Sequence, residues 1–93
     1  MFCGMAVTTA RSGRAEELVA AALDHADALR RQPGCVAAYV LRERQGPGVV
    51  ALSIFESEAA FLQGTTATQP VIARHHLEQL LDGPGEFRTF DVR

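Results

Sequence analysis

Four segments of this chain have the composition of β-strands, and most of them are apolar at consecutive positions. Met1–Val7 is one, and Val49–Phe55, with the sequence VVALSIF, is the clearest. Successive side chains of a strand point to opposite faces of a sheet, so a sheet with one face in water alternates apolar and polar residues. These segments do not alternate, and the two helices that we expect cannot cover both faces. The pattern therefore predicts a partner subunit on the second face and a cavity between sheet and partner.

Length and charge limit the possible classes of protein. The chain has 93 residues, which is the size of one domain, and a domain this small is marginally stable alone, which also favours a homodimer. All nine basic residues are Arg, the net charge is −2, and no long run of like charge occurs, so we expect neither a nucleic-acid partner nor a membrane partner. The start of the chain lacks the features of a signal peptide, so the expected location is cytoplasmic.

The two cysteines, Cys3 and Cys35, do not have the spacing of a metal site or of a disulfide framework. Each begins an expected strand, and in the topology described below these strands are not neighbours. Two strand spacings amount to about 9–10 Å, which is more than a disulfide tolerates between Cα atoms. We therefore expect both to be small buried apolar residues, and no metal.

Turn and capping residues divide the chain into regular elements. A first helix follows Ser12-Gly13 and ends before Pro33-Gly34. Its apolar stripe, at helical spacing, consists of Ala15, Leu18, Val19, Ala22, Leu23, Ala26 and Leu29. A strand over Cys35–Arg44 then leads through a Gly- and Pro-containing turn into Val49–Phe55.

The second helix is expected to begin at Ser57, whose side chain is a good N-cap. Gly64 should interrupt this helix, and Pro70 should restart it as a compatible first residue. The restarted helix would place Ile72, Ala73, Leu77, Leu80 and Leu81 on one face. A last strand is expected over Glu86–Val92.

The resulting order, β-α-β-β-α-β, predicts an α+β, ferredoxin-like sandwich that forms a single domain over residues 1–93. The four antiparallel strands would lie in the order 4-1-3-2, with both helices on one face. RNA-binding modules share this strand order but need basic and aromatic side chains on the central strands, and metal chaperones need a Cys-x-x-Cys loop. The chain has neither feature.

Helical phase separates the histidines. From Pro70 onward, at about 100° per residue, His76 lies about 50° from the centre of the apolar face and His75 about 150° away. His76 is therefore the expected inward-facing histidine, and its imidazole is a side chain that can serve as a general base. His25 lies between two aspartates of the first helix, and we expect it on a solvated face.

Few polar residues interrupt the apolar strands. Tyr39 needs a hydrogen-bond partner if buried, so it either lines a cavity or lies at the dimer seam. Ser53 has no neighbouring acid and base that would activate it as a nucleophile, so covalent catalysis is not indicated.

Three segments resemble the antibiotic biosynthesis monooxygenase family. They are the junction Pro33-Gly34-Cys35, the strand-to-helix entry Phe55–Phe61 (FESEAAF) and the helix start Ser12–Leu18 (SGRAEEL). The resemblance implies a dimeric α+β barrel with an apolar pocket between each sheet and its helices. It also implies that some members oxidise phenols to quinones with molecular oxygen, without metal or flavin cofactors.

In such quinone-forming members, a Trp, an Asn, a Tyr and an Arg are implicated. The matching positions here are Phe55, Ala51, Phe61 and either Arg74 or His76, so three polar groups are replaced by apolar ones. A second branch of the superfamily binds haem through a histidine of the second helix, near His75 here. Its accompanying Asn and Trp are absent, because this chain contains neither residue type.

Two functions are therefore open. The first is a cofactor-free oxygenase acting on an aromatic or phenolic small molecule, with His76 as base and with Phe55, Phe61, Tyr39, Ser53 and Arg74 around the substrate. The second is a non-catalytic dimeric module, either structural or binding a small apolar ligand. Haem binding through His75, without the usual Asn and Trp, is a further alternative.

Overall fold

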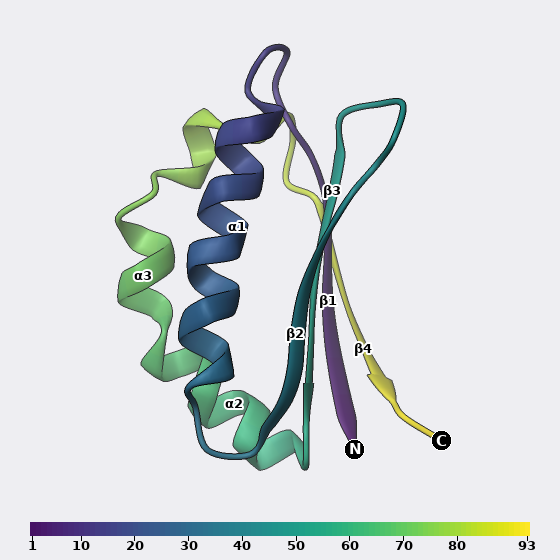
Figure 1. The fold of residues 1–93 in the computed structure, drawn as a ribbon, viewed down its shortest axis with the longest axis vertical. Coiled ribbons are helices and arrows are strands. Elements are labelled where there is room, and N and C mark those ends of the chain that lie inside the picture. Colours follow the sequence, from purple (N-terminus) through teal and green to yellow (C-terminus); the bar gives the residue numbers. More distant parts are fainter.

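A computed structural model describes all residues, 1–93, as one α+β sandwich (Figure 1). The elements are β1 (Phe2–Thr9), α1 (Ala15–Arg30), β2 (Cys35–Arg42), β3 (Gly48–Phe55), α2 (Glu58–Ala67), α3 (Gln69–Ala73), the 3₁₀ turn η1 (Leu77–Gln79) and β4 (Glu86–Asp91). All helices lie on the same side of the sheet, as expected. None of them combines the length and the apolar character that a membrane crossing requires.

The sheet has the strand order β2-β3-β1-β4 and every neighbouring pair is antiparallel, which confirms the predicted ferredoxin-like topology. Gly4 of β1 pairs with Ser53 of β3, and Ser53 pairs in turn with Ala38 of β2. Strand β3 separates Cys3 of β1 from Cys35 of β2, as predicted, and both cysteines are free.

The register assigns the apolar residues of the sheet to two faces. Gly4, Ala38 and Ser53 are buried under the helices. The residues between them in each strand point to the opposite face, which no element of the chain covers. This open face carries Met5, Val7, Tyr39, Leu41, Val50, Leu52, Ile54 and Phe90. Both faces of the sheet are therefore apolar.

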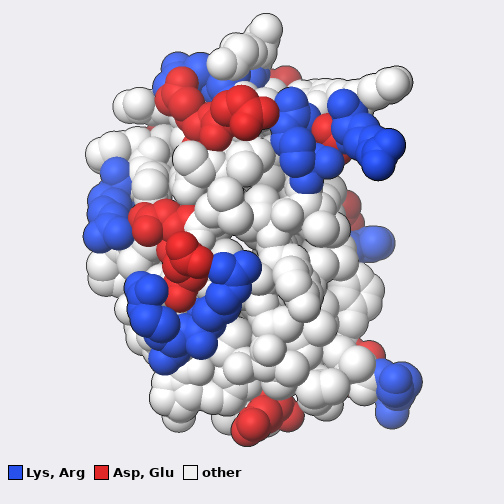
Figure 2. Space-filling view, viewed as in Figure 1, with Lys and Arg blue, Asp and Glu red and all other residues white.

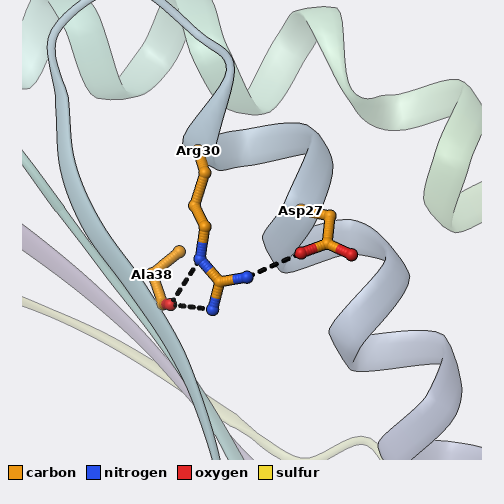
Figure 3. A network of polar contacts seen from close by, with 3 residues as sticks. All are labelled: Asp27, Arg30 and Ala38. Carbon is orange, nitrogen blue, oxygen red and sulfur yellow. Dashed lines mark hydrogen bonds and ion pairs between the residues drawn. The ribbon is translucent and has the colours of Figure 1, made fainter.

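Helix α1 is fixed to the edge strand β2 by one arginine. Arg30 Nε and Nη2 donate to the carbonyl oxygen of Ala38 at 3.1 and 2.6 Å, and Nη1 contacts Asp27 Oδ1 at 2.6 Å (Figure 3). Gly34, with φ 82°, adopts the left-handed conformation after the helix, where glycine is favoured. The predicted end of the helix is thus confirmed.

The second helical region differs from the prediction in where it breaks. Ser57 caps α2 as expected, since its Oγ accepts a hydrogen bond from Ala60 N at 3.1 Å. Gly64, however, lies inside α2, where a Cβ would come within 2.9 Å of the Phe55 ring. This glycine therefore permits a close approach of helix and sheet, and the break falls at Thr68 instead.

The restarted helix is much shorter than predicted. Pro70 occupies the first turn of α3 as expected, but α3 ends at Ala73. His76 then has φ 50°, a left-handed conformation that is incompatible with a continuing α-helix. The expected helical face from Ile72 to Leu81 does not form.

Candidate active site

A cavity of about 450 Å³ lies between the sheet and the helices. It exists because the facing surfaces carry small side chains that cannot fill the space between them. These small lining residues are Gly4, Ala6, Ala38 and Ala51 from the sheet and Ala21, Ala22 and Ala26 from α1. Of the 24 lining residues 17 are hydrophobic, so the cavity suits an apolar or aromatic molecule of small size.

Few polar atoms of the cavity wall remain available to a ligand. The hydroxyl groups of Thr8 and Thr65 donate to the carbonyl oxygens of Val49 and Phe61, at 2.6 and 2.9 Å. Ser53 is only 5% exposed and lines the cavity, and its hydroxyl has no hydrogen-bond partner within the chain. The other polar lining groups are the amide of Gln69 and two imidazoles, one from α1 and one from the segment after α3.

The first imidazole is that of His75. Its Nε2 lies 2.7 Å from Asp24 Oδ2, and Arg74 Nη2 donates to the same oxygen at 3.0 Å. The hydrogen bonds from His75 and Arg74 lower the pKa of the Asp24 carboxyl, so this group is ionised near neutral pH. An ionised carboxylate can only accept, so we assign the proton to His75 Nε2 and a lone pair to Nδ1 in the neutral ring.

The second imidazole is that of His25, whose Nε2 lies 2.9 Å from the hydroxyl of Thr68. Burial lowers the pKa of His25, and the negative charge of Asp24 opposes this shift only in part. His25 is therefore neutral near pH 7. The two imidazoles border the same cavity in different electrostatic surroundings.

The structure corrects the prediction for all three histidines. His76 lies outside the cavity with 65% of its side chain exposed, 3.6 Å from the Glu78 carboxylate, because α3 ends before it and the assumed helical phase does not apply. His75 was expected to face outward, and His25 was expected on a solvated face, yet both line the cavity. The sequence indicates that the helix is not regular here only through the helix-breaking residues from Gly64 to Pro70.

The expected substrate-binding residues divide into two groups. Phe61 and Ser53 line the cavity. Phe55 is fully buried behind Phe61, with the rings edge to face and their centroids 5.8 Å apart, and it is not a lining residue. Tyr39 borders the cavity, but strand alternation directs its side chain to the open face of the sheet. The residue is 53% exposed there. Arg74 is exposed and binds Asp24 instead of entering the cavity.

Ala51, at the position where the resemblance implies an Asn, also lines the cavity and supplies no polar group. No group of three or more His, Cys, Asp or Glu side chains is arranged to hold a metal ion. The chemical capacity of the site therefore depends on the two imidazoles, the Ser53 hydroxyl, the Gln69 amide and the apolar walls.

Several solved structures share the fold of this chain. Rv0793 from Mycobacterium tuberculosis has a TM-score of 0.84 at 16% identity, covering 99% of this chain and 94% of that chain. SO0527 from Shewanella oneidensis has a TM-score of 0.83 at 22% identity, covering 96% and 87%. SnoaB, a cofactor-independent oxygenase from Streptomyces nogalater, has a TM-score of 0.80 at 25% identity, covering 99% and 92%.

No curated protein matches the chain. Residues 1–69, in contrast, match the family model described as antibiotic biosynthesis monooxygenase. This match includes β1, α1, β2, β3 and α2, which supply most of the cavity wall. The chain therefore belongs to the antibiotic biosynthesis monooxygenase family.

Proposed function

We propose that the protein is a cofactor-independent monooxygenase that oxidises a phenolic aromatic molecule with molecular oxygen. The observation that carries this proposal is the apolar cavity bordered by an imidazole with a carboxylate partner. Family membership and the likeness to SnoaB, a cofactor-independent oxygenase, support the reaction class.

The reaction needs a base more than it needs a cofactor. An electron-rich phenolate passes one electron to oxygen, and the phenoxyl and superoxide radicals join through a new carbon–oxygen bond para to the phenol oxygen. After protonation of the peroxide, loss of the ring proton at that carbon and cleavage of the oxygen–oxygen bond yield a quinone and water. One phenol and one oxygen molecule thus give one quinone and one water. The protein has to bind the aromatic, remove its proton and limit access of water.

His75 is the residue that we assign as the base, in place of His76. Nδ1 carries the lone pair, and the ionised Asp24 next to Nε2 stabilises the imidazolium that forms when the phenol proton is accepted. The imidazolium then returns its proton to the peroxide. The same nitrogen next accepts the ring proton and releases it to the departing hydroxide, which leaves as water. Phe61 and Ser53 would form the wall and the floor around the substrate.

Oxygen uptake with 1-naphthol, whose para carbon carries a hydrogen, tests this function. We expect one quinone per oxygen consumed, incorporation of ¹⁸O from ¹⁸O₂ into the new carbonyl group, and no product under nitrogen. The reaction should persist in protein dialysed against a chelator and free of flavin absorbance. Hydrogen peroxide formed in place of labelled quinone would contradict a monooxygenase. Binding of 1-naphthol without any oxygen uptake would instead support the non-catalytic ligand-binding module.

We further propose that a second copy of the chain covers the open face of the sheet, which would form a homodimer. Tyr39, Leu41 and Phe90 are 53%, 50% and 42% exposed on this face, together with other apolar side chains. A continuous apolar surface of this kind is unusual on a monomer and typical of an interface. Figure 2, in contrast, shows acidic and basic groups side by side on the face of the molecule that it presents.

A further inference from the structure

The hydroxyl of Thr68 determines which nitrogen of His25 carries the proton. Thr68 Oγ1 lies 2.9 Å from the carbonyl oxygen of Gly64, 3.3 Å from that of Thr65 and 2.9 Å from His25 Nε2. A hydroxyl has one proton, and both carbonyl oxygens can only accept. If that proton pointed to His25, the Thr68 oxygen would face two carbonyl oxygens with no hydrogen between them. His25 Nε2 is therefore the donor, and Thr68 accepts.

This assignment leaves the lone pair of neutral His25 on Nδ1. Thr68 is 2% exposed, so water cannot readily replace this contact and change the tautomer. His25 lines the cavity, and its hydrogen bond to Thr68 is the one that it makes within the chain. The hydroxyl protons of Thr8 and Thr65, which line the same cavity, are already committed to backbone carbonyls. Ser53, the other lining hydroxyl, makes no hydrogen bond to His25, so Nδ1 has no donor within the chain and a ligand in the cavity can supply one.

We infer that His25 Nδ1 recognises a hydroxyl group of the substrate other than the one that loses its proton to His75, so that the site prefers dihydroxyaromatic molecules. This inference rests on the proposed function for the location of the substrate. The two imidazoles then have distinct tasks, since the ionised Asp24 assists only the ring of His75 through a hydrogen bond. His25 stays neutral and accepts a hydrogen bond, which makes it a specificity-determining residue.

Binding measured by calorimetry under nitrogen tests this preference without turnover. The probes are 1,5-, 1,6- and 1,7-dihydroxynaphthalene, each compared with the compound in which the second hydroxyl is a methoxy group. We expect at least one diol to bind about fivefold to tenfold more tightly than its ether, the range that one hydrogen bond supplies. In His25→Leu this ratio should fall to about one, whereas His75→Gln should retain it. Equal binding of every pair by the wild-type chain, or failure to bind any of these compounds, would overturn the inference.

Two variants of Thr68 separate recognition from packing. Thr68→Val keeps the shape but removes the acceptor for His25 Nε2, so the preference for the diol should weaken, and Thr68→Ser should retain it. A steric preference against the methoxy group would persist in both variants and would overturn the inference.

Nitrogen NMR of the ligand-free chain provides a measurement independent of any ligand. At pH 7 we expect the His25 ring as the neutral Nε2–H tautomer, and a dominant Nδ1–H tautomer would overturn the assignment. Failure of the proposed function has a different signature. A diol preference that depends on His25, without oxygen uptake, would refute the oxygenase alone, whereas quinone formation without this preference would refute the inference alone.

Discussion

Gly4 of β1 lies directly against the ring of Phe61 of α2, so closely that a Cβ at position 4 would come within 2.6 Å of Cζ. Phe61 also packs on Phe2, with ring centroids 5.0 Å apart, and lines the cavity. The absence of a side chain at Gly4 therefore determines how near α2 can approach the sheet. It also positions one wall of the site.

Gly4→Ala should force the Phe61 ring to move and should lower the free energy of unfolding by about 1–3 kcal/mol, the usual cost of overpacking a core. Urea denaturation monitored by circular dichroism measures this change. Combining it with Phe61→Leu should cost less than the sum of the two single changes, because the smaller side chain relieves the clash. Strict additivity would contradict the proposed contact.

The adjacent histidines provide a matched pair for catalysis. His75→Gln should lower kcat for 1-naphthol oxidation about a hundredfold, a typical loss when a general base is removed. His76→Gln should leave kcat unchanged, because His76 is exposed outside the cavity. Steady-state oxygen uptake measures both. The opposite ranking of the two variants would restore His76 as the base.

Filling the cavity should block ligand binding without unfolding the chain. Ala51→Leu adds a side chain at the sheet surface of the cavity, so 1-naphthol should no longer bind, while the melting temperature should be maintained or increased. Ala59→Leu, at an exposed position of α2, is the control and should bind normally. Calorimetry and thermal melts measure the two effects. Undiminished binding by Ala51→Leu would place the ligand elsewhere.

His25 should make stability depend on pH. Burial holds the native pKa of His25 below its usual value of 6.5, so between these two pKa values the unfolded chain binds more protons than the native chain. The free energy of unfolding therefore rises with pH in this window, and it falls as the pH drops below about 6.5. The negative charge of Asp24 favours the protonated His25 ring and therefore reduces the effect.

Melting temperatures measured between pH 5 and 8 should reveal this contribution as a difference from His25→Gln. The wild-type chain should lose stability toward low pH more steeply than the variant, since glutamine does not titrate. Parallel curves would show that His25 is not buried as described.

The open face of the sheet should control assembly. Leu52→Lys places a charge in the middle of this face and should convert a dimer into a monomer, as measured by size exclusion with light scattering. Leu23→Lys, at a position of α1 that is 45% exposed, is the control and should remain dimeric. A wild-type chain that is monomeric at micromolar concentration would refute the dimer.

Most of the fold could be predicted from local signals. Runs of apolar residues such as Val49–Phe55, and stops such as Pro33-Gly34, act over a few residues and gave the right strand order. The prediction of a helix break at Gly64 is wrong. This glycine instead allows α2 to contact Phe55 of β3, and a contact between two elements leaves no signal in the local sequence.

The site was less predictable, because its geometry depends on pairs that are far apart in the sequence. Asp24 and His75 are separated by 51 residues, and His25 and Thr68 by 43. The residues of each pair belong to different elements, so the periodicity of one helix cannot show that they are in contact. The end of α3 at Ala73, about two turns before the predicted end, was also enough to exchange the expected roles of His75 and His76.

The bond between Arg30 and the Ala38 carbonyl has a consequence for aggregation. Strand β2 lies at the edge of the sheet, and an exposed edge offers unpaired backbone groups to strands of other molecules. An incoming strand would have to displace a guanidinium that donates two hydrogen bonds to this carbonyl and is also held by Asp27. Arg30 therefore hinders the pairing of another strand with this part of β2. Self-association is then favoured through the open face of the sheet, and fibril-like growth from this edge is disfavoured.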